Sequence, residues 1–153
     1  MAATQSIASG LLFLNFCMYV IVSAIGGWAI NVAIDRGFII GSELQLPAHF
    51  SAIHFPMGNA ATGFFVVFSL IAGVVGAASA INGINHIRSW RKESSSSAQS
   101  SAIIAWSLTL LAMGLACKEI ELEIRNACLR TMEAFTIILS ATQLIYIIVI
   151  QAL

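Results

Sequence analysis

Four long apolar stretches, separated by polar segments, dominate the pattern along the chain. At ~1.5 Å of helical rise per residue, roughly 20 residues cross a ~30 Å hydrocarbon core. Residues 7–34 and 60–84 provide 28 and 25 positions without a charge. Residues 101–125 and 129–152 are also strongly apolar, and their charges gather where the two stretches approach each other. The pattern predicts an all-α membrane protein, a four-transmembrane-helix bundle that forms a single domain over 1–153.

The connections between these stretches differ in character. Residues 35–59 hold both prolines and two of the three histidines, and predict a long loop between helices 1 and 2. Residues 85–100 combine a basic cluster with a serine run, and predict a flexible polar connector. Apolar residues continue at helical spacing past residue 117, so we expect an extended third helix reaching about Arg125, with Asn126 offering a helix stop.

The second apolar stretch carries two adjoining rows of small residues. They are Ser69, Gly73 and Ala77 in one row and Ala72, Gly76 and Ala80 in the other. In lipid, helices associate mainly through close packing, so such a face indicates the helix on which neighbours pack. The alternative is that glycine and alanine are simply common in membrane helices. The same face would also serve a homo-oligomer.

Asparagines and cysteines lie within or beside the predicted spans. We expect Asn15 and Asn31 to bond neighbouring helices, because a buried amide in lipid needs a partner. Cys17 is interpreted as a small packing residue. Cys117 and Cys128 lie near one membrane face and would form a disulfide only if that face is extracellular.

Composition strengthens the membrane assignment and excludes several classes. Hydrophobic residues make up 59% of the chain and charged residues 9%, with zero net charge. A soluble domain of this size could not cover so much apolar surface, so the lipid bilayer is the expected partner. No basic tract suggests nucleic acid. No catalytic motif or metal-ligand spacing is present, so we expect no enzyme activity, metal or cofactor.

Charge distribution gives an orientation and a candidate binding face. The basic cluster of 85–100 is compact, which favours placing it and both termini in the cytosol, although the loop charges leave the converse open. The opposite face carries the candidate ligand-binding residues, which are Arg36, His54, Arg125, Arg130 and Glu133. Arg130 and Glu133 are spaced i, i+3 where a helix enters apolar surroundings. They form either a structural salt bridge or part of a gate or anion-binding site.

Three segments bear a resemblance to a known family. They are FLNFCMYVIVSAIGGWAIN (13–31), HFPMGNAATGFFVVFSLIAGVVGAASAINGINHIRSW (54–90) and RTMEAFTIILSATQLIYI (130–147). Together they resemble the abscisic-acid-induced plasma-membrane polypeptides of plants, the AWPM-like family. The resemblance implies a four-span plasma-membrane protein linked to abscisic acid and to drought or cold tolerance. Members of that family have been proposed to carry abscisic acid into cells.

Two functions remain open from the sequence. The first is transport, in which the protein mediates uptake of abscisic acid or a related weak acid, with a proton gradient as driving force and Glu133 or His54 as the proton-responsive group. Arginines on the candidate face would then meet the carboxylate. The second is a non-transporting structural tetraspan protein that organises or protects the plasma membrane under dehydration through lateral contacts.

Overall fold

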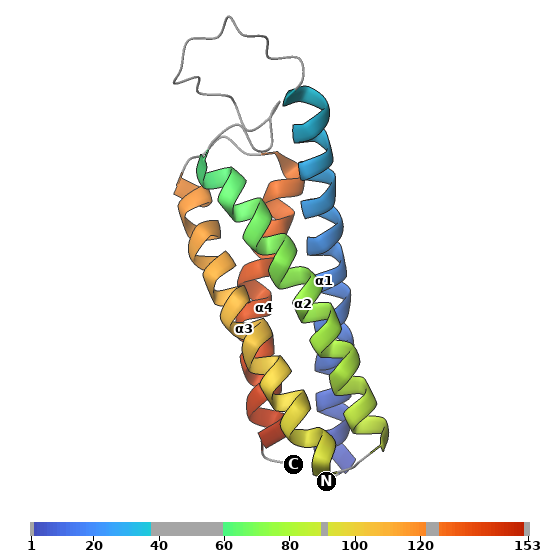
Figure 1. The fold of residues 1–153 in the computed structure, drawn as a ribbon. Coiled ribbons are helices and arrows are strands. Elements are labelled where there is room, and N and C mark those ends of the chain that lie inside the picture. Colours follow the sequence, from blue (N-terminus) through green and yellow to red (C-terminus); the bar gives the residue numbers. More distant parts are fainter. Residues whose placement is uncertain (1, 38–59, 90–91, 122–125, 152–153) are drawn as a thin grey trace, which may run out of the picture.

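The structure, a computed structural model, describes residues 2–37, 60–89, 92–121 and 126–151. It contains four long helices, which are α1 (Ala2–Gly37), α2 (Ala60–Ser89), α3 (Lys92–Glu121) and α4 (Ala127–Gln151). Figure 1 shows them running alternately up and down the long axis, with the two chain termini at the same end. The prediction of an all-α four-helix bundle is confirmed.

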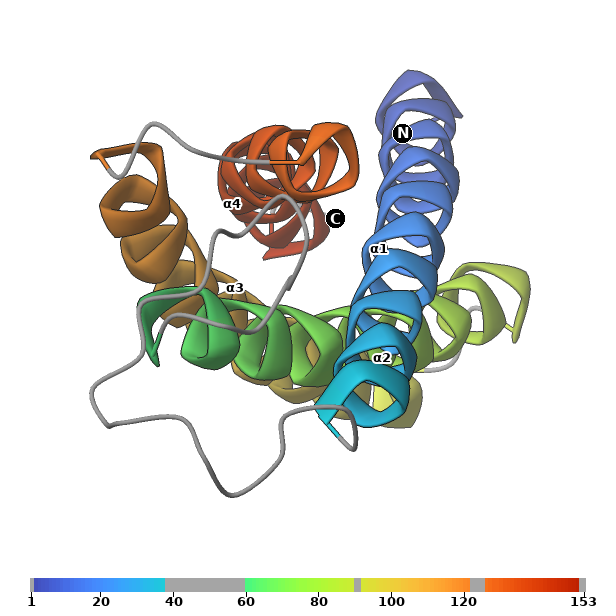
Figure 2. The same ribbon diagram turned by 90° about the horizontal axis from the view of Figure 1, so that it is seen from above.

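Each helix packs against two neighbours around a common axis. The main contacts join α1 to α2, α2 to α3, α3 to α4 and α4 back to α1. The view along the axis in Figure 2 shows this ring of helices. All four helices therefore contribute one face to a shared interior.

The buried positions of α3 repeat with a period of 3.5 residues. Each is no more than 1% exposed, and they are Ala98, Ala102, Ala105, Thr109, Ala112, Ala116 and Glu119. A spacing of alternating three and four residues is that of interlocking side chains in coiled coils and membrane bundles. Because five of the seven side chains are alanine, neighbouring helices can approach α3 closely. The same spacing recurs on the other helices, for example at Leu12, Asn15, Tyr19 and Val22 of α1.

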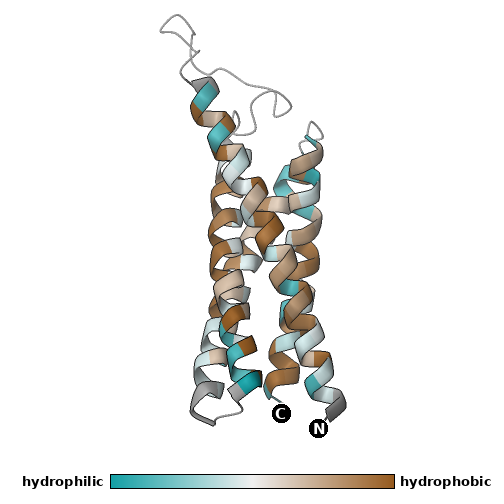
Figure 3. Ribbon diagram, turned by 90° about the vertical axis from the view of Figure 1, so that its right-hand side faces the viewer, coloured by the Kyte–Doolittle hydropathy of each residue, from teal (hydrophilic) through white to brown (hydrophobic). Residues whose placement is uncertain are grey.

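The outer surface of the bundle is apolar. Phe13, Ile104 and Ile148 are 67%, 57% and 57% exposed. All four helices are long and apolar enough to cross a membrane, over Thr4–Asp35, Ala61–Arg88, Ser95–Glu121 and Ala127–Gln151. Figure 3 shows hydrophobic residues along the middle of the helices and hydrophilic residues towards their ends. The chain is a multi-pass membrane protein with its apolar surface towards lipid.

The prediction of a flexible connector over 85–100 is wrong for the residues described there. Residues 85–89 belong to α2, and residues 92–100 form the first turns of α3. Ser97 of this region and the adjacent Ser101 have hydrogen-bond partners within the helices. Ser101 donates to the Ala98 carbonyl at 3.0 Å, and Asn82 of α2 donates to Ser97 at 3.3 Å and to Ser101 at 3.1 Å. These bonds between helices stabilise a helical conformation that serine propensity alone does not favour.

The two predictions about Asn126 and Asn31 have different outcomes. Asn126 lies outside the helices and caps the start of α4, because its side-chain Oδ1 accepts a hydrogen bond from the Cys128 N–H at 3.2 Å. The prediction for Asn31 is wrong within the described residues, because Asn31 is exposed and donates to Asp35 of its own helix at 3.2 Å instead of to a neighbouring helix. The predicted loop lies outside the described residues over 38–59, as does the expected end of the third helix over 122–125.

Candidate functional site

The small-residue face of α2 lies inside the bundle. Its residues Ser69, Ala72, Gly73, Gly76 and Ala80 are buried, and Ala77 is half-buried. A Cβ atom at Gly76 would lie less than 3.0 Å from the ring of Tyr19 on α1. A Cβ atom at Gly73 would lie equally close to the Ser23 hydroxyl and 3.0 Å from the Tyr19 carbonyl oxygen. The two glycines therefore allow the backbone of α2 to pack closely against α1.

Tyr19 links three helices in the centre of the bundle. Its ring lies against Gly76 of α2, and its hydroxyl is 2.9 Å from the Thr109 hydroxyl of α3. Thr109 donates its own hydrogen to the Ala105 carbonyl at 2.7 Å, so Tyr19 is the donor between the two hydroxyls. Tyr19 and Thr109 are each 1% exposed. This pair forms a polar contact in the middle of an apolar bundle.

A second polar contact joins α1, α3 and α4. Asn15 donates from Nδ2 to Oε1 of Gln143 at 2.9 Å, and Nε2 of Gln143 is 3.5 Å from the Ala102 carbonyl oxygen. The prediction that Asn15 bonds a neighbouring helix is confirmed. Asn15 Oδ1 and the Tyr146 hydroxyl are buried, and neither has a hydrogen-bond partner among the described residues. Both atoms therefore retain hydrogen-bonding capacity within the membrane span.

Two carboxylic side chains are buried near the end of the bundle opposite the chain termini. Thr62 of α2 donates to the two Glu119 carboxylate oxygens of α3 at 2.8 and 3.0 Å. Glu119 is fully buried, and Glu133 of α4 is only 3% exposed. Burying an ionisable group within a membrane span is costly, so such groups commonly mark substrate paths or proton relays.

Of the predicted binding residues, only Glu133 points into the described interior. Arg130 is exposed, so the i, i+3 pair does not share one environment. Arg36 lies in the last turn of α1, where only its backbone is described, and His54 and Arg125 lie outside the described residues. No three His, Cys, Asp or Glu side chains gather as a metal site within the described part of the chain. All three cysteines are free.

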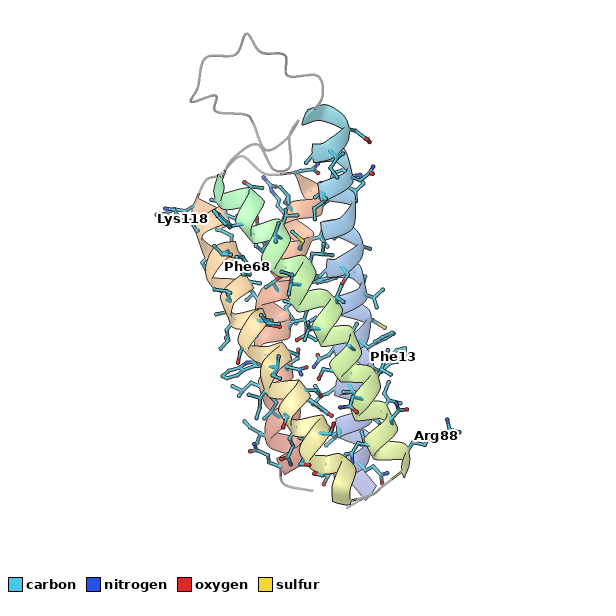
Figure 4. The ribbon with its side chains drawn as sticks, in the orientation of Figure 1. Phe13, Phe68, Arg88 and Lys118 are labelled. Atoms are coloured by element: carbon cyan, nitrogen blue, oxygen red, sulfur yellow. The ribbon has the colours of Figure 1, made fainter. Side chains whose placement is uncertain are left out.

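The described cations lie outside the bundle. Arg88, Lys118 and Arg130 are the lysine and arginine residues whose side chains are described, and all three are exposed. Lys118 and Arg88 point away from the helices at opposite ends in Figure 4. Lys118 forms an ion pair with Glu121 on the outer side of α3. The described interior is therefore acidic and neutral-polar in character.

Sequence reasoning missed Thr62, Tyr19, Thr109 and Gln143 as members of the interior, and did not recognise that Glu119 is buried. A usable signal was present in α3. The alanines from Ala98 to Ala116 repeat every three or four residues, and extending this spacing includes Thr109 and reaches Glu119.

Comparison with known proteins decides the family. Residues 13–153, which include most of α1 and all of the other helices, match the AWPM-19-like family. The chain belongs to the AWPM-19-like family. It is similar to "Membrane protein PM19L" of Oryza sativa subsp. japonica, with 43% identity over 144 residues that cover 94% of this chain and 76% of the rice protein. The expected AWPM-like resemblance is confirmed. No solved structure matches the chain.

Proposed function

We propose that this AWPM-19-like protein is a plasma-membrane transport protein that mediates uptake of abscisic acid or a related weak acid. The observation that carries the proposal is the polar interior of the bundle, which includes two buried carboxylic side chains within membrane-spanning helices. The hormone, and the plasma membrane as its location, come from the family resemblance. The proposal places both termini in the cytosol and assigns no enzyme activity.

The character of the interior favours the neutral form of the acid. A carboxylate inside the bundle would approach Glu119 and Glu133, whereas the described cations are exposed. Like charges at short range in a medium of low dielectric constant repel strongly. A protonated acid avoids this repulsion, and its C=O and O–H groups match the hydroxyl and amide side chains of the interior. Uptake of the neutral acid moves one proton with each molecule, so an inward proton gradient drives accumulation.

Uptake of radiolabelled abscisic acid into liposomes containing the purified protein tests the proposal. We expect saturable uptake that unlabelled hormone competes away and that an inward proton gradient accelerates. Empty liposomes measure the passive entry of the neutral acid, which must be subtracted at every pH. Uptake no faster than in empty liposomes, from protein shown to be folded, would refute transport.

A pair of matched substitutions tests the role of the interior. Glu133→Gln removes a buried carboxyl group with little change in volume. Because the path then loses its proton-responsive group, we expect uptake to fall to the level of empty liposomes. Glu121→Gln makes the same chemical change at an exposed, Lys118-paired position, and we expect uptake to stay unchanged. Uptake at the wild-type rate by both variants would show that Glu133 lies off the path.

The structural tetraspan function is the second candidate, and the tight contact of α1 with α2 favours it. Gly73 and Gly76 leave no room for larger side chains between these helices, as a static scaffold requires. Under this function a folded protein shows no uptake, and bulky substitutions at the two glycines impair assembly. Cross-linking of the protein in native membranes would then identify its lateral partners.

A further inference from the structure

We propose that the polar interior forms a proton-conducting column that works without any hormone. The proposal goes beyond weak-acid uptake, because it requires only protons and internal water. It rests on the order in which the interior polar residues follow one another along the four helices. The two functions can therefore be tested separately.

All four helices present their interior polar residues in one consistent order along the bundle axis. The residues descend from the end opposite the termini as Thr62, Ser69, Ser79 and Asn82 on α2, as Glu119, Thr109 and Ser101 on α3, as Glu133, Thr136, Gln143 and Tyr146 on α4, and as Tyr19 and Asn15 on α1. Thr62 and Asn82 are 20 residues apart. At ~1.5 Å per residue this distance is about 30 Å, which equals the thickness of the hydrocarbon core.

Hydrogen bonds between helices fix the register of these levels. Thr62 donates to Glu119 at 2.8 Å near the end opposite the termini, called here the upper end. The hydroxyls of Tyr19 and Thr109 are 2.9 Å apart in the middle of the bundle. Asn15 bonds Gln143 at 2.9 Å one turn further along α1.

The column continues towards the end that carries the termini. Ser79 donates to Ser101 at 3.3 Å, and Asn82 donates to Ser101 at 3.1 Å. Asn82 also bonds Ser97, which is exposed. The column therefore reaches the surface of the bundle at this end through serine hydroxyls.

Three interior atoms have open hydrogen-bonding capacity between these contacts. They are Ser69 Oγ, Asn15 Oδ1 and the Tyr146 hydroxyl. All three residues are fully buried, and none of the three atoms has a partner among the described residues. Ser69 follows Thr62 by seven residues, about two helical turns, and so lies between the upper contact and the Tyr19 level. Leaving a buried polar atom without a partner costs about 1–3 kcal/mol, and an internal water removes that cost. The three atoms thus mark hydration sites in the gaps of the column.

The Tyr146 hydroxyl lies directly beside a glycine of α2. A Cβ atom at Gly83 of α2 would lie less than 3.0 Å from the Tyr146 hydroxyl. The hydroxyl is thereby held close to the backbone of α2 next to Asn82, and Tyr146 follows Gln143 by three residues on α4. A water bound to the Tyr146 hydroxyl can therefore join the column where the Gln143 and Asn82 contacts meet.

Proton movement along such a column breaks and forms only O–H bonds. Each hydroxyl or water accepts a proton on a lone pair and releases its own proton to the next oxygen, while the buried carboxyl groups take up and release protons near the upper end. Asn15 and Gln143 hold the water and do not themselves relay the proton. Besides the two buried carboxyl groups, the charged side chains described around the upper end are those of Asp35, Lys118, Glu121 and Arg130, and all four are exposed.

Proton flux into liposomes tests the column. The full-length protein is reconstituted with a pH-sensitive dye inside, a potassium gradient with valinomycin supplies the driving potential, and hormone is absent. The double variant Tyr19→Phe with Thr109→Val removes both hydroxyls of the central contact. Ser107→Ala removes an exposed hydroxyl two residues from Thr109 and is the matched control. The conservative Thr109→Ser variant keeps its hydroxyl and controls for folding.

We expect the wild type to conduct protons faster than empty liposomes. In the double variant this proton flux should fall about tenfold, which corresponds to a rise of about 1.4 kcal/mol in the barrier to conduction. Ser107→Ala and Thr109→Ser keep the wild-type flux. A folded wild type that conducts no faster than empty liposomes overturns the proposal, as does a double variant with undiminished flux. Hormone uptake without hormone-independent flux would refute the column and leave weak-acid transport standing. Proton flux without hormone uptake would refute weak-acid transport and leave the column standing.

Discussion

Gly76→Ala gives the sharpest test of how α1 and α2 pack. The added methyl would lie less than 3.0 Å from three atoms of the Tyr19 ring, so the ring must move. Overpacking of this kind costs about 1–3 kcal/mol. Movement of the ring also weakens the 2.9 Å contact with Thr109, and a hydrogen bond between membrane helices contributes about 0.6 kcal/mol on average. We therefore expect Gly76→Ala to destabilise the bundle by about 1–3.5 kcal/mol.

The measurement is equilibrium unfolding of the purified protein in bicelles, with Gly114→Ala as the matched control. A Cβ atom at Gly114 meets nothing within 4 Å, so the same chemical change there should alter stability by less than about 0.5 kcal/mol. Adding Tyr19→Leu to Gly76→Ala frees space for the methyl, and the pair should cost less than the sum of the single changes. Equal stability of Gly76→Ala and Gly114→Ala, or strict additivity in the pair, would refute the packing described here.

Three further outcomes follow from named contacts. Thr62→Val leaves the buried Glu119 without its hydroxyl donor, and we expect a loss of about 1–3 kcal/mol in the same unfolding assay, whereas a neutral effect would contradict the contact. Asn126→Ala removes the cap of α4 and should cost about 1 kcal/mol, with Asn126→Asp retaining stability as the control. Four spans place the N- and C-terminal tags on one side of the membrane, so protease protection that differs between the two tags would contradict the topology.

The spans could be predicted from sequence because their signal is additive along the chain. Long, predominantly apolar stretches without a charge leave few alternatives to a membrane helix, whatever the packing between helices. The bond of Asn15 to a neighbouring helix could also be predicted, because a buried amide in mid-span has few possible partners except those on other helices.

The boundaries and the interior depend on contacts that a linear pattern does not display. Serines near the start of α3 are weak helix formers, and their helical conformation is supported by bonds to Asn82 of another helix. Arg130 and Glu133 appear adjacent by spacing, yet the rotation of α4 exposes one and buries the other. On α3, the three-and-four spacing of the alanines indicated which face is buried. Using that signal requires the helical period to be considered together with hydropathy.

Transport through the polar interior is tested most directly by gradient-driven uptake of radiolabelled abscisic acid into liposomes that contain wild type, Glu133→Gln or Glu121→Gln protein in equal folded amounts. We expect saturable uptake by the wild type and by Glu121→Gln, and uptake at the level of empty liposomes for Glu133→Gln. Wild-type uptake no faster than that of empty liposomes would contradict transport. Unchanged uptake by Glu133→Gln would contradict a path through the polar interior.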